Sequence, residues 1–156
     1  MKYLKTSFLI LFSMILFSCQ DTQTVVDTNI ELNKRNWSYA QKVKVPVKIE
    51  SADIPYNVYF NLRHTADYKY SNIFILIHLT SPNGKKITER KEFQLALPDG
   101  EWLGSGSGNK YSYQIKFKEN YKFPKAGTYT FELEQNMRDN PLNHVSDAGI
   151  RVEKAQ

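Results

Sequence analysis

The sequence predicts an all-β domain in which about eight antiparallel strands pack as a two-sheet sandwich. Three observations lead to this prediction. Apolar and polar side chains alternate with a period of two, and turn signals separate the alternating runs. Tyr and Phe are abundant, with 10 and 9 residues, and aromatic side chains favour strands. No segment has a helical apolar stripe of useful length. A closed β-barrel is the alternative arrangement.

The predicted strands follow one another along the chain. In the run 43–49 the apolar residues alternate with lysines and Pro46. Because proline lacks an amide donor, this strand belongs at a sheet edge or carries a bulge at the proline. The runs 57–63, 111–117 and 129–133 alternate in the same way. Further strands are predicted at 25–32, at 87–95, which is mostly polar, and at 149–152.

The run 73–79 is apolar on both faces, which predicts a central strand covered on each side. It contains His78, which we expect to be a hydrogen-bonded core histidine, whereas His64 and His144 are expected to be solvated. The run ends at a Ser-Pro-Asn-Gly turn signal. A glycine- and serine-rich patch at 104–109 is predicted to be a mobile loop, because glycine lacks a Cβ atom.

The first residues have the features of an export signal. Lys2 and Lys5 form a basic head, and the run 8–17 is almost wholly apolar. A membrane-spanning helix needs roughly 20 apolar residues, so this run of about ten is too short. A basic head followed by a short apolar run is typical of a secretory signal peptide.

The segment LFSC, residues 16–19, resembles a bacterial lipobox, which implies cleavage before Cys19 and attachment of lipid to that residue. Acyl chains would then anchor an exported protein to a membrane of the cell envelope, the inner or the outer. Cys19 is the only cysteine, so no internal disulfide can form. The predicted organisation is a signal peptide at 1–18, the lipidated cysteine and a short tether at 19–24, and one β-sandwich domain at 25–156.

The sequence indicates neither a catalytic site nor a cofactor or metal site. The three histidines are far apart, and the glycine-serine patch fits neither a nucleophile elbow nor a phosphate-binding loop. Glu132 and Glu134 share one strand face, so a carboxylate hydrolase is a possible activity, but solvent-facing side chains are expected there. The mature chain carries about +3 charges without a basic cluster, and we expect no nucleic-acid partner.

Binding residues are easier to find than catalytic ones. Trp37 and Trp102 occur in turn-like surroundings, where an indole either anchors a partner or caps the sandwich core. Asn61 and Arg63 occupy the polar face of a strand, and Arg138 lies in a loop. These five residues are the partner-binding candidates. The alternative is that the polar ones are solvated or brace loops.

Several blocks of the chain resemble the gliding-motility lipoprotein family GldH of Bacteroidota. They are YNVYFNLR at 56–63, DY at 67–68, YSNIF at 70–74, LPDGEWLG at 97–104, FP at 123–124, GTYTF at 127–131 and EQNMRDNPL at 134–142. Together with the lipobox they cover most of the mature chain. The resemblance implies a membrane-anchored lipoprotein that is required for gliding and is linked to the secretion system that delivers motility adhesins.

Two functional hypotheses remain beside the hydrolase. The first is a non-enzymatic accessory or assembly component of the gliding machinery and its linked protein secretion system, with other envelope proteins as partners. The edge strand with Pro46 and the loop around Trp102 would then be contact surfaces. The second is a surface glycan-binding lipoprotein in which Trp37, Trp102 and exposed tyrosines such as Tyr59 stack on sugar rings. The resemblance carries over no catalytic residue.

Overall fold

The computed structural model describes residues 23–155. The predicted signal peptide, Cys19 and most of the predicted tether therefore lie outside the described residues. The first strand, β1, begins at Thr24, the last residue of the predicted tether. Within the described part of the chain, no helix is both long and apolar enough to cross a membrane.

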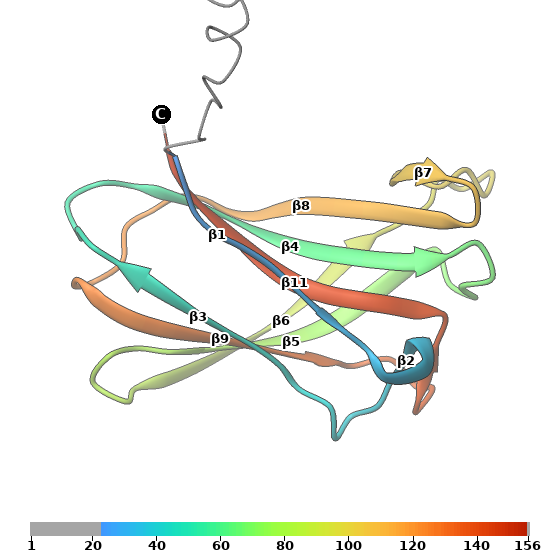
Figure 1. Ribbon diagram of the computed structural model, residues 1–156, viewed down its shortest axis with the longest axis horizontal. Helices are drawn as coiled ribbons and strands as arrows, with labels where there is room; N and C mark the ends of the chain where they lie inside the picture. Colours follow the sequence, from blue (N-terminus) through green and yellow to red (C-terminus); the bar gives the residue numbers. More distant parts are fainter. Residues whose placement is uncertain (1–22, 156) are drawn as a thin grey trace, which may run out of the picture.

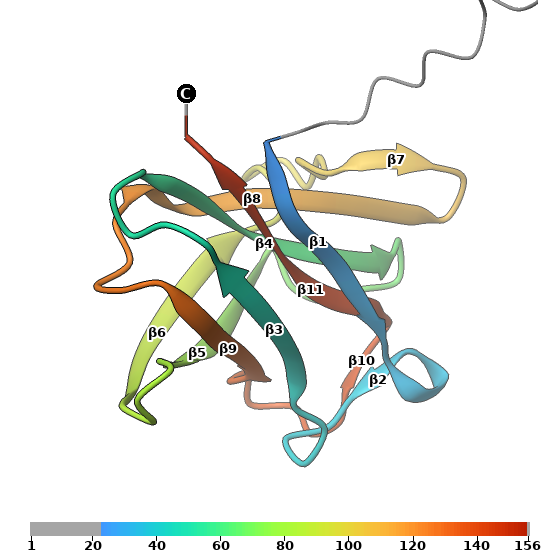
Figure 2. The same ribbon diagram turned by 60° about the vertical axis from the view of Figure 1, so that its left-hand side comes forward.

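Two antiparallel sheets face each other as the layers of a β-sandwich (Figures 1 and 2). The five-stranded sheet has the order β1 (Thr24–Glu31), β11 (Val145–Lys154), β4 (Tyr56–Thr65), β8 (Lys110–Tyr121) and β7 (Ser105–Ser107). The four-stranded sheet has the order β3 (Val43–Ile49), β9 (Gly127–Gln135), β5 (Asn72–Thr80) and β6 (Lys86–Gln94). A separate two-stranded sheet, β2 (Asn36–Trp37) paired with β10 (Leu142–Asn143), lies at one end of the sandwich. β2 directly follows the 3-10 turn Asn33–Arg35.

None of the sheets in residues 23–155 closes into a barrel, which confirms the sandwich prediction. The edge position of the proline-containing strand is also confirmed. β3 lies at the edge of the four-stranded sheet, and Pro46 is paired with Thr130 of β9. Because β3 has a hydrogen-bonded neighbour on one side only, the missing amide donor of Pro46 can point away from the ladder.

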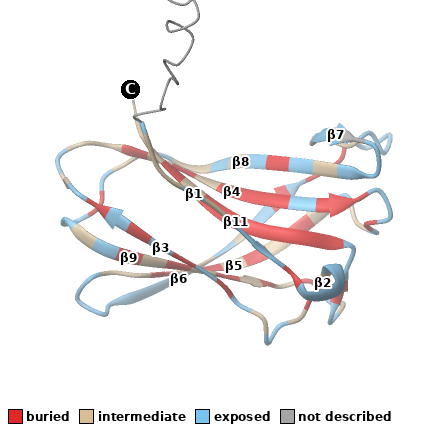
Figure 3. Cartoon of the chain, in the orientation of Figure 1, coloured by how far each residue is buried: buried red, intermediate tan, exposed pale blue. Residues whose placement is uncertain are grey.

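The core lies between the two inner faces, where alternate side chains of each strand are buried (Figure 3). In β3 the burial alternates strictly, with Val43, Val45, Val47 and Ile49 inside. Aromatic rings join the sheets, since Phe60 of β4 stacks on Phe93 of β6 with ring centroids 4.7 Å apart. Burial of these apolar side chains is the main stabilising contribution, because no disulfide can form.

The prediction that strand 73–79 is covered on both faces is wrong. β5 is an interior strand of its sheet, but only its odd-numbered residues are buried, and the even-numbered ones are half-buried on the outer face. His78 is therefore not a core residue. Its Nδ1 atom lies 2.7 Å from the Thr88 hydroxyl, and its Nε2 atom lies 3.5 Å from a Glu134 carboxylate oxygen. Long side chains from β6 and β9, rather than a third layer, shield this face.

The glycine- and serine-rich patch is not wholly a loop, as the sequence predicted, because Ser105–Ser107 form β7 and pair with β8. Gly106 lies opposite Tyr111, and a Cβ atom on this glycine would lie 2.8 Å from the tyrosine ring. The glycine thus permits the close approach of the two strands. The last strand is also longer than expected, since β11 runs from Val145 to Lys154.

The core description can be tested with two leucines of contrasting exposure. Leu133 on β9 is 0% exposed, whereas Leu103 is 52% exposed. We expect Leu133→Ala to lower the free energy of unfolding by about 2–5 kcal/mol, because it leaves a cavity between the sheets. Leu103→Ala is the matched control, with a change within about 0.5 kcal/mol. Denaturant unfolding measures both, and equal losses would contradict the two-layer core.

Candidate functional site

The strand register defines two ends of the sandwich. Thr24 pairs with Glu153, and Tyr56 pairs with Lys154, so the chain enters the domain beside its own C-terminal end (Figure 1). We call this the proximal end. The opposite, distal end carries the last residues of β4, where His64 pairs with Val145. The loops 66–71, 95–104 and 136–141 lie there as well, because each joins strands that begin or end at that side.

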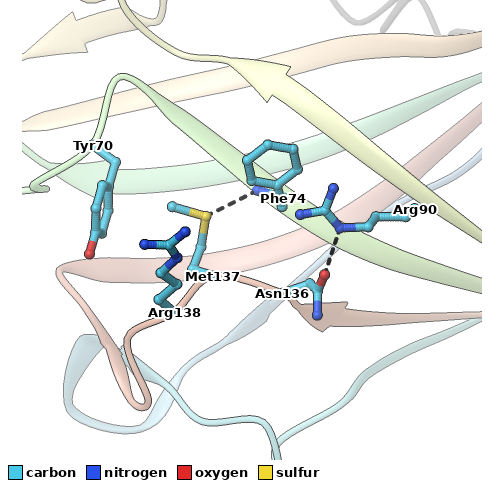
Figure 4. Close-up of a pocket in the computed structure, with 6 residues that line it drawn as sticks. All are labelled: Tyr70, Phe74, Arg90, Asn136, Met137 and Arg138. Atoms are coloured by element: carbon cyan, nitrogen blue, oxygen red, sulfur yellow. Dashed lines mark hydrogen bonds between the residues drawn. The ribbon is translucent and has the colours of Figure 1, made fainter.

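A recess of about 460 Å³ opens on the outer face of the four-stranded sheet, near the distal end. Figure 4 shows its lining side chains, which come from β5, β6, the loop before β5 and the loop after β9. We call it the arginine pocket, and its lining residues are Tyr70, Phe74, Arg90, Asn136, Met137 and Arg138. Of the five sequence-predicted binding residues, only Arg138 belongs to it.

Arg90 is held in a defined orientation within the pocket. Its guanidinium carbon lies 3.9 Å from the centroid of the Phe74 ring, which is a favourable cation–π position. Its Nε atom donates a hydrogen bond of 2.7 Å to the side-chain oxygen of Asn136 (Figure 4). One face of the guanidinium is thus covered by the Phe74 ring, and one of its donors, Nε, is bonded to Asn136. The Nη donors remain directed to the pocket.

Arg138 contributes a second guanidinium. Its side chain is exposed, and within residues 23–155 it forms neither a hydrogen bond nor an ion pair. The floor between the two arginines is apolar, because the Phe74 ring is half-buried and Met137 is 8% exposed. The Met137 sulfur accepts a 3.2 Å hydrogen bond from the Phe74 backbone amide, which fixes the thioether against β5. The pocket thus combines positive charge with an apolar surface.

The loop that carries Arg138 is organised by Gln135, the last residue of β9, whose side chain is 0% exposed. Its Oε1 atom accepts a 2.8 Å hydrogen bond from the Met137 amide. Its Nε2 atom donates to the Asp139 carbonyl at 3.0 Å and to the Trp37 carbonyl at 3.3 Å. One buried amide therefore ties the loop to β2, and this explains why Met137 and Arg138 have fixed positions.

Trp37 does not offer the binding surface that was predicted for it. It is 0% exposed, and its indole amine donates a 2.8 Å hydrogen bond to the Gln41 carbonyl. Leu142 of β10 is its strand partner. The alternative reading, in which this indole caps the core, describes its position, because the short β2–β10 pair folds over the end of the sandwich. Its backbone supports the arginine pocket through Gln135.

Trp102 is half-buried and covers His64, with ring centroids 4.5 Å apart. The prediction that His64 is solvated is wrong, since it is 0% exposed and lies among aromatic rings. Even-numbered residues of β4 point inward, so His64 lies inside by register. The surrounding rings are those of Tyr68, Trp102, Tyr111 and Tyr113, at centroid distances of 4.5–5.8 Å. His144 is exposed, as expected.

Both ring nitrogens of His64 lie within hydrogen-bond distance of a partner, and burial favours the neutral ring. Its Nδ1 atom lies 2.8 Å from the Thr65 carbonyl, which can only accept, so Nδ1 carries the proton. Its Nε2 atom lies 3.1 Å from the Tyr113 hydroxyl oxygen, and this hydroxyl donates its proton to the Leu95 carbonyl at 2.9 Å. Burial lowers the pKa of His64 and raises the pKa of Tyr113 to about 12. Both rings are consequently uncharged near neutral pH.

Asn61 and Arg63 lie on the outer face of the other, five-stranded sheet, so the structure does not bring them together with Arg138. The Asn61 side-chain amide donates a 2.7 Å hydrogen bond to Asp27, and only 4% of the residue is exposed. Arg63 uses its Nε atom to bind both carboxylate oxygens of Asp147, at 2.8 and 2.7 Å. The Asn61 amide and the Arg63 Nε atom are therefore engaged within the sheet.

The carboxylate pair on β9 is held by lysines. Glu134 lies 3.0 Å from Lys42, and Glu132 lies 3.2 Å from both Lys44 and Lys86. The hydrogen bond from Lys42 lowers the pKa of Glu134, whereas a general acid needs a raised pKa. Among the described residues, no group of three His, Cys, Asp or Glu side chains is placed to hold a metal ion.

Sequence reasoning missed Arg90 and Phe74 as site residues. Their proximity depends on the β5–β6 hairpin, in which Leu76 pairs with Arg90 and Phe74 pairs with Glu92. The turn at 81–84 was recognisable, and extending the pairing outward from it would have placed Arg90 diagonal to Phe74. The contact of Met137 with β5 has no comparable local signal.

Fold and site together define a small β-sandwich domain with an arginine-lined recess on one outer face. A family model described as GldH lipoprotein matches residues 24–152. The chain belongs to the GldH lipoprotein family, as its resemblance to that family predicted.

Two relatives match nearly the whole chain. A gliding motility lipoprotein GldH homolog of Christiangramia forsetii is 33% identical, over 95% of this chain and 94% of the relative. The gliding motility lipoprotein GldH of Flavobacterium johnsoniae is 27% identical, over 99% of both chains. No solved structure matches the chain. These similarities identify a gliding-motility lipoprotein that is exported and lipid-anchored in the cell envelope.

The role of Gln135 can be tested by removing its side-chain amide. We expect Gln135→Ala to lower the free energy of unfolding by roughly 2–4 kcal/mol, since it removes a hydrogen-bond partner from the Met137 amide and from the Trp37 and Asp139 carbonyls. Gln41→Ala is the control, because Gln41 hydrogen-bonds to the described residues through its backbone amide and carbonyl and not through its side chain. Denaturant unfolding gives both values. Equal stabilities would show that Gln135 does not organise the loop.

The burial of neutral His64 predicts a pH dependence. Its folded-state pKa lies below the unfolded value near 6.5, so the unfolded chain binds more protons at mildly acidic pH. The contribution of neutral His64 to the free energy of unfolding is complete above about pH 6.5, and it is lost as the pH falls toward the pKa of His64 in the folded protein. We expect stability to decline between pH 7 and 5 in the unaltered protein, and less steeply in His64→Gln. If melting temperature falls with pH equally steeply in the unaltered protein and in His64→Gln, the conclusion that His64 is buried and neutral is contradicted.

Proposed function

We propose that this chain is a non-enzymatic accessory or assembly component of the gliding machinery and its linked protein secretion system, and that the arginine pocket is its contact with another envelope protein. The observation that carries the proposal is the pair of guanidinium groups, Arg90 and Arg138, around an apolar floor. Neither arginine forms an ion pair with a carboxylate of the described residues. Arginine and tyrosine are among the residue types enriched at the positions that dominate protein–protein binding energy, and Tyr70 lines the same pocket.

The position of the pocket supports this role. We propose that Cys19 carries the lipid, five residues before the start of β1 at Thr24. The membrane would then lie toward the proximal end. The arginine pocket lies near the opposite end of the strands, where a protein in the aqueous part of the envelope can reach it. The short polar tether would allow the domain to stand away from the lipid surface.

The chemistry of the remaining polar groups supports a non-enzymatic role. Glu132 and Glu134 are neutralised by lysines, so neither is poised as a general acid. His64 is enclosed by aromatic rings and cannot meet a substrate without opening of the core. His78 is engaged with Thr88 on the sheet face. Catalysis would require a nucleophile and a base within reach of one another in an accessible cleft.

The glycan-binding alternative depended on exposed aromatic rings. Trp37 is buried, Trp102 packs its ring against His64, and the Tyr59 hydroxyl hydrogen-bonds to the Glu153 carboxylate. Lys116 additionally lies over the Tyr59 ring, with its ammonium nitrogen 5.8 Å from the centroid. A sugar ring stacks on an open aromatic face. The contacts of Trp37, Trp102 and Tyr59 therefore support a packing role for these side chains rather than glycan binding.

The proposal can be tested in gliding cells whose own copy is replaced by variants of this chain. We expect the double variant Arg90→Gln/Arg138→Gln to reach normal membrane abundance but to reduce colony spreading at least fivefold, because the partner contact is lost. The matched control is Lys34→Gln/Arg35→Gln, which removes the same charge from exposed residues outside the pocket. Normal spreading by the pocket variant, at normal abundance, would refute this contact.

A separate variant addresses the anchor. Cys19→Ala should shift the protein out of the membrane fraction and abolish labelling by radioactive palmitate, with loss of spreading. If this variant remains in the membrane fraction and the unaltered protein takes up no label, the lipid anchor at Cys19 is wrong. Immunoblots of both fractions separate loss of anchoring from loss of the protein.

A further inference from the structure

The arginine pocket carries positive charge that its own sheet does not balance. Three lysines on this outer face are matched by carboxylates, Lys42 with Glu134, and Lys44 and Lys86 with Glu132, whereas Lys48 of β3 forms no ion pair with the described residues. The arginines of the pocket are not matched either. A planar guanidinium fork matches a carboxylate with two parallel hydrogen bonds, and it is less strongly hydrated than an ammonium group. The pocket therefore concentrates unpaired donors for an anion.

The nearest acid in sequence does not neutralise Arg138. Asp139 is the following residue, but a hydrogen bond from the Tyr70 hydroxyl lowers its pKa, and Lys69 lies 3.5 Å from its carboxylate. Asp139 is thus occupied by the loop before β5, on the side of the pocket wall formed by Tyr70. Because Gln135 holds the Asp139 carbonyl, this arrangement is built into the loop.

One of the two guanidinium groups, that of Arg90, is also preorganised. Arg90 rests on Phe74 and is fixed by Asn136, so binding an anion costs little additional side-chain entropy there. The Met137 and Phe74 surfaces beside the arginines can accept an apolar side chain, and methionine adapts well to different shapes. A free phosphate or sulfate ion would use the guanidinium donors but would leave this apolar floor unoccupied.

We propose that the arginine pocket binds an extended acidic segment of a partner protein, in which a Glu or Asp carboxylate accepts hydrogen bonds from Arg90 and Arg138. An apolar side chain next to that carboxylate packs on Phe74 and Met137. The volume of about 460 Å³ is sufficient for two such side chains but not for a folded domain. This inference rests on the proposed function, and it specifies the chemistry of the partner at the same site.

The test uses the full-length lipidated protein in phosphatidylcholine nanodiscs. The probes are fluorescein-labelled, end-capped octapeptides in which two glutamates alternate with Phe, Leu, Ile or Tyr, and matched peptides with glutamine in place of glutamate. Fluorescence anisotropy should show binding of at least one glutamate peptide, at least tenfold tighter than its glutamine counterpart. Raising the salt concentration from 50 to 500 mM should weaken it, because the contact is charge-dependent.

Variants connect this binding to the pocket. Arg138→Gln changes an exposed residue that has no partner among residues 23–155, so it should leave the melting temperature unchanged and weaken peptide binding at least tenfold. Arg138→Lys should retain part of the affinity. Phe74→Ala should weaken binding through loss of the apolar floor. The control Lys34→Gln/Arg35→Gln should change the affinity less than twofold.

Three outcomes would overturn the inference: no glutamate peptide binds up to 1 mM, the glutamine peptides bind equally well, or Arg138→Gln binds like the unaltered protein. The same binding measurement in nanodiscs that contain phosphatidylglycerol tests whether an anionic lipid competes with the peptide. If the anionic lipid displaces no peptide, the peptide site stands, whereas arginine-dependent lipid binding without peptide binding would reassign the pocket to a lipid headgroup. Peptide binding together with normal gliding of the arginine variants would refute the proposed function and leave the ligand chemistry intact.

Discussion

The arrangement of the distal end depends on the buried side chain of Gln135. Its amide is completely enclosed, and each of its polar atoms has a backbone partner, so its desolvation is compensated. Through these bonds β9, the loop after it and β2 become one unit. An apolar residue at this position would leave buried backbone groups unsatisfied, and the loop could no longer present Met137 and Arg138 to β5. The pocket is therefore a consequence of core hydrogen bonding.

The two-layer architecture also determines where polar chemistry can occur. Each inner face is filled by apolar and aromatic side chains, and His64 is admitted only as a neutral ring with hydrogen-bond partners on both nitrogens. Each outer face has no covering layer, so long side chains shield the strands by pairing with one another. Arg63 with Asp147 and Lys42 with Glu134 belong to this shielding. Arg90 also shields Phe74, but it has no carboxylate partner in the part of the chain that the structure describes.

A gliding-motility lipoprotein with these features is suited to recognition. Its domain needs no disulfide, since aromatic packing such as Phe60 on Phe93 joins the sheets. Its chain enters at one end of the strands, and its arginine pocket opens near the other. With the proposed lipid at Cys19, this separation would leave the arginine pocket away from the membrane, where the proposed protein partner could reach it.

The sequence by itself determined the class of fold, the strands with period-two alternation, the edge position of Pro46 and the membership of the GldH family. Those features are local, because alternation and turn residues act within a few positions of each other. The tertiary structure alone decided which tryptophan is buried, that His64 lies inside and that Arg90 joins Arg138 in one pocket. These depend on which strands become neighbours, and the pairing of distant segments leaves no signal in the composition of either segment.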